Sequence, residues 1–235
     1  MKSLRIVVGL MLGAIGFASG YGLKSLAAPG ATGEAAHAEE LPKDIYADSR
    51  NRLPLPKREE LDPEAQKLYD NATKGVRSAA GLRGPGGIKL HNPRLAVLME
   101  PAGQYVRFDS KLGNPLTQVA MLVTAREMNC WFEWNGHERQ AREAGIPQNV
   151  IDAIKYRKPL TGIDEKHAVI IQLGREDLGN HEVSSGTFAR ALKALGKENL
   201  VTALAVMGYQ ANTALLLTAF NQQLPPGEKS LLPMP

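Results

Sequence analysis

The fold and the chemistry of this chain are indicated by one stretch, Arg126-Glu127-Met128-Asn129-Cys130-Trp131-Phe132-Glu133-Trp134-Asn135-Gly136-His137-Glu138. It contains the only cysteine and both tryptophans of the sequence, with a glutamate and a histidine at helical spacing from the cysteine. An α-helix advances about 100° per residue, so Glu133, Trp134 and His137 lie within about 60° of Cys130. If the helix extends back to Glu127, a second carboxylate joins that face. We therefore predict one helix face that carries a thiol, two carboxylates, an imidazole and an indole.

Such a face is unlike an ordinary structural one. A buried face would consist of Leu, Val and Ala, and a solvent-exposed face would not place Cys and Trp beside charged groups. Taken singly, each residue has a plain interpretation, because a lone helical Cys is usually a small buried hydrophobic residue and a lone His or Glu is usually on the surface. Their coincidence on one face predicts that the face lines a cavity and handles protons.

The same stretch carries a resemblance to a known family. Arg126-Glu127 is followed by Cys-x-x-Glu-x-x-x-His, from Cys130 to His137, and by Ala-x-x-x-Gly at Ala141 and Gly145. This pattern resembles the carboxymuconolactone decarboxylase family and its relative, the alkylhydroperoxidase D family. Flanking segments extend the resemblance over about residues 55–225: Gly84-Pro85 and Leu90-His91-Asn92-Pro93 upstream, Gly208-Tyr209 and Ala219-Phe220-Asn221 downstream.

The resemblance implies an all-helical fold that assembles as a homotrimer or homohexamer. It implies catalytic roles for Glu127, Cys130 and His137, and less directly for Glu133. The last position is a departure, because the peroxidase branch has a second cysteine there. A dithiol cycle needs two thiols, so a chain with one cysteine cannot form the intramolecular disulfide.

Residues 1–38 are typical of a signal peptide. Lys2 and Arg5 give a positive start, residues 6–17 form an apolar run, and Ala36-His37-Ala38 offers a small-x-small cleavage site. The run is short and glycine-rich for a stable span, which favours cleavage over retention as a membrane anchor. We expect the folded part to be exported to the periplasm, with membrane contact only through an uncleaved leader.

Charge and cysteine content restrict the remaining possibilities. The formal net charge is +4, of which the leader contributes half, so the mature surface is close to neutral and nothing indicates nucleic acid as a partner. A single cysteine in an oxidising compartment cannot form an internal disulfide and is open to oxidation unless it is shielded. We therefore expect Cys130 to lie in a narrow pocket or to be chemically useful.

The hydrophobic pattern predicts an all-α protein with one helical-bundle domain at 61–225, an extended arm at 39–60 and a C-terminal tail at 226–235. Capping residues and apolar stripes predict helices over 62–73, 93–108 and 114–127, then through the site stretch to Gly145, and over 147–156, 164–178, 184–195 and 198–224. The last is apolar over much of its surface, so we expect it to contact another subunit too. Residues 77–87 are glycine-rich and are predicted to form a loop near the site.

The function that these residues favour is a lyase, decarboxylase or isomerase acting on a small unsaturated organic acid or lactone, with no cofactor. His137 is the natural acid or base, since imidazole titrates near neutrality, and Glu133 or Glu127 would be its partner. Cys130 would be a proton donor or a small polarisable wall. Candidate substrate contacts are Arg83, His91, Trp131, Trp134 and Tyr209, the last with core packing as its alternative.

Three other functions remain open from the sequence. Cys130 near His137 suits a thiol peroxidase or redox protein that needs an external resolving thiol. His91, His137, Glu127, Glu133 and Cys130 are acceptable metal ligands, but the chain has no His-x-x-x-His, so no metal site is assigned. The fold could also serve a non-catalytic exported binding protein.

Overall fold

The computed structural model describes residues 41–74 and 81–233, so the predicted leader lies outside the described residues. The described part of the chain is helical, without a strand beyond one isolated bridge between Tyr46 and Asn51. Residues 39–235 form one compact unit. The helices are α1 (Pro63–Thr73), α2 (Pro85–Leu90), α3 (Pro93–Gln104), α4 (Asn114–Glu127), α5 (Trp131–Glu143), α6 (Gln148–Lys155), α7 (Glu165–Gly174) and α8 (Ser185–Ala219). The all-α, single-domain prediction is confirmed.

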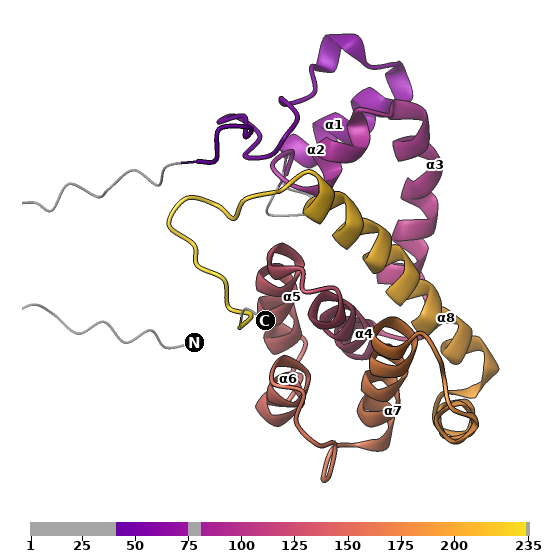
Figure 1. The fold of residues 1–235 in the computed structure, drawn as a ribbon. Helices are drawn as coiled ribbons and strands as arrows, with labels where there is room; N and C mark the ends of the chain where they lie inside the picture. The colour runs from indigo at the N-terminus through magenta and orange to yellow at the C-terminus, as the bar shows by residue number, and fades with distance from the viewer. Residues whose placement is uncertain (1–40, 75–80, 234–235) are drawn as a thin grey trace, which may run out of the picture. The chain divides into compact units, whose positions relative to one another are not determined.

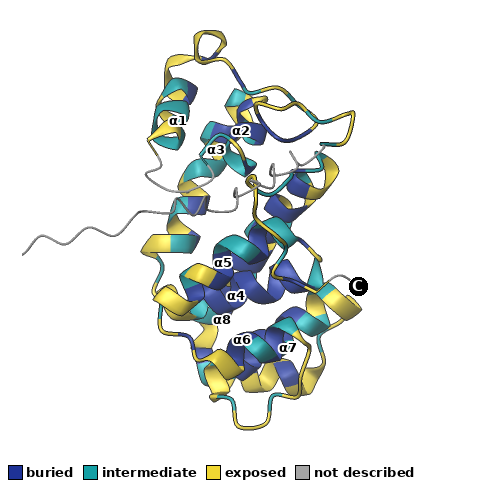
Figure 2. Ribbon diagram, turned by 90° about the vertical axis from the view of Figure 1, so that its left-hand side faces the viewer, coloured by how far each residue is buried: buried dark blue, intermediate teal, exposed yellow. Residues whose placement is uncertain are grey.

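Helix α4 is the centre of the bundle. It packs against α5, α7 and α8, and every residue from 117 to 126 is buried, so that it is dark blue along most of its length in Figure 2. Gly174 allows α7 to approach closely, because a Cβ at this position would collide with the Val123 side chain. Figure 1 shows α1, α2 and α3 grouped at one end of the domain and α6 and α7 at the other. Helix α8 runs between the two groups.

The long C-terminal helix, α8, consists of two helical pieces that follow each other directly in the sequence. Gly196 has φ 74° and ψ 168°, which interrupts the helical backbone where the sequence predicts a boundary between 184–195 and 198–224. The second piece ends at Ala219, earlier than predicted, and Asn221 then adopts a positive φ of 48°. Among the described residues, only Ser185–Ala219 is long and apolar enough to cross a membrane. Half of its most apolar window is buried within the domain, as in a core helix.

Several helix starts agree with the predicted caps. Asp62 accepts hydrogen bonds from the backbone N–H groups of Glu64 and Ala65, and Ser184 accepts one from Thr187. Two segments differ from the prediction. Residues 85–87, expected in a loop, form the first part of α2, which begins with Pro85 at its first position. Helix α3 ends at Gln104 and continues as a π-helix, Tyr105–Asp109, labelled η2.

The N-terminal arm and the C-terminal tail pack against each other and against the bundle. Asn51 Nδ2 donates to Gln222 Oε1 at 2.9 Å, and Arg50 Nε donates to the Leu224 carbonyl at 2.7 Å. Further along, Asn135 on α5 bonds the backbone of Lys229 and Leu231, both at 2.9 Å. Leu232 is buried in the main core. The described part of the tail is therefore held on its own domain.

Candidate functional site

The site helix, α5, does not extend back to Glu127, because a tight turn separates it from α4. Helix α4 ends at Glu127, Asn129 has a positive φ of 48°, and Cys130 is the N-cap of α5. The Cys130 N–H bonds the Ala125 carbonyl at 2.9 Å, which is the closure of a Schellman C-cap. Asn enters the left-handed region more readily than most residues, so Asn129 was the sequence signal for this break.

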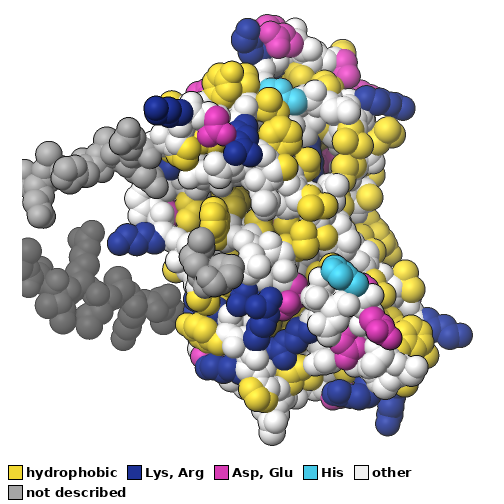
Figure 3. Space-filling model, viewed as in Figure 1, with side chains coloured by type: hydrophobic (Ala, Val, Ile, Leu, Met, Phe, Trp, Pro, Cys, Tyr) yellow, Lys and Arg dark blue, Asp and Glu magenta, His cyan; other side chains and the backbone are white. Residues whose placement is uncertain are grey.

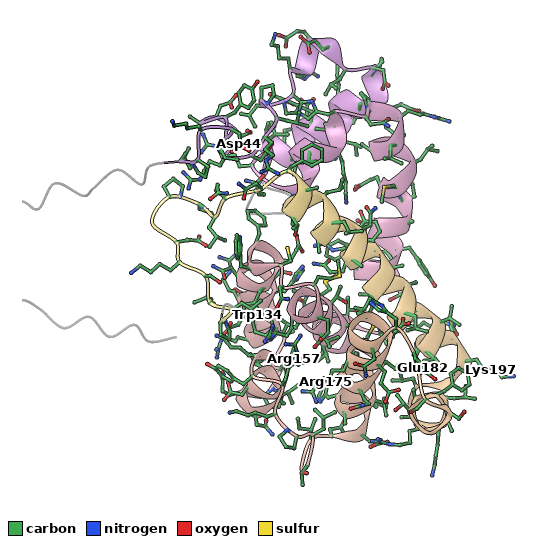
Figure 4. All side chains as sticks on the ribbon, in the orientation of Figure 1. Asp44, Trp134, Arg157, Arg175, Glu182 and Lys197 are labelled. Atoms are coloured by element: carbon green, nitrogen blue, oxygen red, sulfur yellow. The ribbon has the colours of Figure 1, made fainter. Side chains whose placement is uncertain are left out.

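Because of this break, Glu127 does not share a face with Glu133 and His137. Its carboxylate is buried and pairs with Arg157, with Oε2 2.8 Å from Nη2. It also lies against Gly179, after α7 (Figure 4 labels Arg157). The predicted catalytic residue Glu127 therefore lies in an ion pair between α4 and the segment after α6, and it does not line the cavity described below.

The tryptophans are also outside the cavity. Trp134, labelled in Figure 4, is fully buried in the main core, and its Nε1 donates to Glu138 Oε2. Trp131 is half-buried and does not line the cavity. Neither tryptophan lines the cavity as predicted. Trp134 lies on the side of α5 that faces the main core, whereas Glu133 and His137 lie on the side that faces the cavity.

Cys130 is buried with Ile88, Ala214 and Leu217 and does not line the cavity. Burial, together with the negative charge of Glu133, raises the pKa of its thiol to about 12. A thiolate is the reactive form of cysteine, so this environment disfavours nucleophilic or redox chemistry at neutral pH. This position agrees with the predicted shielding of Cys130. Cys130 does not share the cavity with His137.

The structure contains one large cavity, about 450 Å³, in the described part of the chain. Its wall is built from α1, α2, α3, η2, α5, α8 and the start of the tail. The apolar lining includes Leu68, Leu90, Met99, Phe108 and Phe132. The polar lining includes Lys89, Arg107, Glu133, His137, Tyr209, Gln210 and Thr213. This volume is in the usual range for small-molecule sites.

Glu133 and His137 meet one turn apart on α5 and are both nearly inaccessible, at 7% and 5% exposure. His137 Nε2 lies 3.1 Å from Glu133 Oε2, and His137 Nδ1 lies 3.1 Å from Gln118 Oε1 on α4. Gln210 on α8 donates its Nε2 to Glu133 Oε2. Both hydrogen bonds to the carboxylate end on Oε2, which leaves Oε1 for a molecule in the cavity.

This network favours the charged form of Glu133. Burial by itself raises the pKa of Glu133, but the hydrogen bonds from His137 and Gln210 and the charges of His137 and Arg107 outweigh it, and the pKa lies below its usual value. Glu133 is therefore held as a carboxylate beside His137.

Lys89 and Arg107 are two of the basic residues that line the same cavity. Lys89 Nζ on α2 donates to Tyr209 Oη at 3.3 Å and to Thr213 Oγ1 at 3.4 Å. Burial lowers the pKa of Lys89 to about 8, with Arg107 adding to the effect and Glu133 opposing it. The buried Nε of Arg107, on η2, has no hydrogen-bond partner among the described residues. An unpartnered buried donor in a cavity indicates that a bound molecule supplies its acceptor.

Arg83 and His91 are placed differently from their prediction. Arg83 Nε donates to the Asp48 carbonyl at 2.8 Å, and His91 Nε2 lies 2.9 Å from the Pro54 carbonyl. Both side chains are exposed and neither lines the cavity. They hold the N-terminal arm against α2. Lys89 and Arg107 line the cavity instead.

Of the predicted site residues, Glu133, His137 and Tyr209 line the cavity. Sequence reasoning missed Lys89, Arg107, Gln118, Gln210 and Thr213. A signal for two of them exists, because Gln210 and Thr213 interrupt an otherwise apolar helix beside Tyr209. Lys89 and Arg107 carry no such signal, since a single cation in a helix is usually solvated. Within residues 41–74 and 81–233, no three His, Cys, Asp or Glu side chains cluster as a metal site would require.

No family model matches the chain, and no curated protein matches it. Two solved structures of the debrominase Bmp8 are similar in fold, at 10% sequence identity. The ligand-free form superposes with a TM-score of 0.59, and a cysteine-to-alanine variant in complex with 2,3,4-tribromopyrrole with 0.58. Each match covers 73% of this chain and 90% of the debrominase. The chain therefore shares the helical fold of that enzyme.

Proposed function

We propose that this protein is an enzyme that transfers a proton at a carbon next to a carbonyl group of a small organic acid or lactone. The observation that carries the proposal is the buried Glu133–His137 pair, joined at 3.1 Å on the wall of a cavity that also contains Lys89 and Arg107. Enolate chemistry needs a base beside the acidic carbon and a positive group beside the developing oxyanion. The cavity offers both.

The roles follow from the hydrogen bonds. Glu133 Oε1 is the atom that takes the proton from carbon, while His137 and Gln210 fix the carboxylate through Oε2. Lys89 and Tyr209 stabilise the oxyanion, and Arg107 binds a carboxylate of the substrate. The apolar wall of Leu90 and Phe132 suits an unsaturated carbon skeleton. Decarboxylation, double-bond isomerisation and lactone opening by β-elimination all use an enolate, and the proposed chemistry needs no cofactor.

Fold similarity to a small-molecule enzyme supports catalysis in general, and the motif from Cys130 to His137 supports a relation to carboxymuconolactone decarboxylases. A thiol peroxidase is less well supported, because Cys130 lies outside the cavity and the pKa of its thiol is about 12. A binding protein without catalysis is a further possibility, and hydrogen–deuterium exchange distinguishes it from an enzyme.

The proposed setting is an exported homotrimer or homohexamer. Large hydrophobic side chains are exposed on α3 and η2, at Leu95, Leu98, Tyr105 and Phe108, and on α8, at Val201 and Leu215. Figure 3 shows hydrophobic side chains spread over the upper part of the face that carries α3 and α8. Apolar surface of this kind is typical of an interface between subunits.

The proposal is tested by hydrogen–deuterium exchange in D2O. The protein is incubated with β,γ-unsaturated acids, unsaturated γ-lactones and 2-oxo acids, and exchange at the carbon next to the carbonyl group is followed by NMR. We expect exchange in at least one class, with Glu133→Gln slowing it at least about 100-fold. Cys130→Ser is the matched control and retains exchange. Loss of exchange in the cysteine variant alone would favour the thiol enzyme, and tight binding without any exchange would favour a binding protein.

A further inference from the structure

Lys89 lies in an environment that differs from that of the other cavity groups. Its two hydrogen bonds go to neutral hydroxyls, Tyr209 Oη and Thr213 Oγ1, and its Nζ lies 4.7 Å from the centre of the Tyr209 ring. The charged groups that act on it across the cavity are Arg107 on η2 and Glu133 on α5. Glu133 is already engaged by His137 and Gln210, so the amine has no dedicated counter-ion in these contacts.

The position of the Tyr209 hydroxyl is fixed by a close approach of two helices. A Cβ at Gly103 on α3 would overlap the Tyr209 hydroxyl and ring edge, so only glycine lets this side chain reach its place beside Lys89. A hydroxyl held next to an amine inside a cavity is able to relay protons to and from a molecule that the amine contacts. The Lys89–Tyr209 pair therefore has a second chemical use besides electrostatics.

We propose that Lys89 Nζ is a nucleophile that forms an imine with the carbonyl carbon of a 2-oxo acid whose carboxylate is bound by Arg107. This assignment rests on the proposed function and names its substrate class. Arg107 accounts for the acid group, since its buried Nε lacks a partner among the described residues. Lys89 accounts for the neighbouring carbonyl group, and Glu133 then faces the next carbon along the chain.

The step balances without any co-reactant. The lysine ammonium gives a proton to solvent, with the Tyr209 hydroxyl as a relay, the free amine attacks the carbonyl carbon, and a C–N bond forms. The carbonyl oxygen leaves as water after receiving two protons, so that an ammonium and a ketone give a protonated imine and one water molecule. Glu133 Oε1 removes a proton from the adjacent carbon to give an enamine, and hydrolysis later returns the free lysine.

Two features of the site favour imine formation over simple charge stabilisation. Burial and the neighbouring arginine keep the pKa of Lys89 near 8, so that a fraction of the amine is uncharged at neutral pH. The pKa of Glu133 lies below its usual value, which makes this carboxylate a weak base. A weak base removes a proton from carbon efficiently only when the carbon is strongly activated, and a protonated imine activates it far more than a hydrogen-bonded ketone does.

The test is reductive trapping on the full chain. Protein is incubated at pH 8 with 4-methyl-2-oxopentanoate and sodium borohydride, digested, and mapped by mass spectrometry. We expect the reduced adduct on Lys89 to exceed that on the exposed Lys111, the internal control, at least about ten-fold. 4-Methylpentan-2-one, which lacks the carboxylate, is expected to label Lys89 at least about five-fold less. Labelling of Lys89 is expected to rise between pH 7 and pH 9.

Lys89→Arg is the matched variant, because it retains the positive charge but cannot form an imine. We expect its circular dichroism spectrum and Tm to stay close to those of the wild type and specific trapping to disappear. Equal labelling of Lys89 and exposed lysines in the wild type would overturn the inference, whatever the variant does. If deuterium exchange needs Glu133 but no adduct forms on Lys89, this inference fails and the proposed function stands. If Lys89 is trapped but Glu133→Gln exchanges normally, the proposed function fails instead.

Discussion

Helix α5 buries two glutamates that face opposite surroundings. Glu138 is enclosed by Trp134, Arg142 and Lys155, each of which donates to its carboxylate. Glu133 has two donors, His137 and Gln210, both on one oxygen, and it lines the cavity. Burial raises the pKa of both and hydrogen bonding lowers it further than burial raises it. The two glutamates therefore differ in whether a carboxylate oxygen is left for a ligand.

The largest expected effect separates these two glutamates by activity. Glu133→Gln keeps the size of the side chain and removes the base, so we expect turnover to fall by about 100-fold to 10,000-fold. Glu138→Gln is the matched control on the same helix and keeps activity within about three-fold of the wild type. Steady-state rates on whichever compound undergoes exchange provide the comparison. Equal losses in the two variants would show that the distinction between them is wrong.

The free energy of unfolding is expected to show the opposite order, with a larger effect of Glu138→Gln than of Glu133→Gln. Glu138→Gln leaves Lys155, whose side chain is 13% exposed, without its charged partner, so we expect a loss of about 2 to 4 kcal/mol at pH 7. Urea unfolding measures it. The folded pKa of Glu138 is below its unfolded value, so its stabilising contribution is present above about pH 4.3 and is lost as the pH falls through the folded value. The wild-type and variant curves are therefore expected to converge in acid.

A smaller effect concerns Lys89, which the site holds at a cost in stability. Its folded pKa is about 8 against a usual value of 10.5, so charging it is harder in the folded state. The penalty is complete below pH 8 and disappears above the unfolded pKa. We expect Lys89→Met to raise the free energy of unfolding by about 1 to 3 kcal/mol at pH 7, with the gain vanishing near pH 10.5. Urea unfolding at both pH values measures this difference. A lower free energy of unfolding for Lys89→Met than for the wild type at pH 7 would contradict the lowered pKa of Lys89.

The smallest effect is expected on the exposed side of α2. Arg83→Ala and His91→Ala each remove one contact to the N-terminal arm. Because both side chains are exposed, we expect each change to cost less than about 1 kcal/mol and to leave turnover unchanged. A large rise in KM for an acidic substrate in either variant would return these residues to the site.

The sequence by itself determined the helical class of the protein, most helix boundaries and the Glu133–His137 pair. These follow from local rules: Asp62, Ser184 and Gly196 act on their own neighbours, and residues four apart on one helix meet wherever the helix packs. The motif resemblance also implied an all-helical fold, and the fold shared with the debrominase is helical.

Only the tertiary structure decided which groups share the cavity. Asn129 has a left-handed backbone conformation that ends α4, so Glu127 points away from Glu133. Helical spacing therefore cannot be extended across this turn. Lys89, Arg107 and Gln210 come from α2, η2 and α8, which are far apart in sequence and meet only because these elements pack around one hollow. Packing brings together charges that a linear pattern keeps apart, and burial then sets their pKa values. For that reason the contact between Glu133 and His137 was predictable and its cationic surroundings were not.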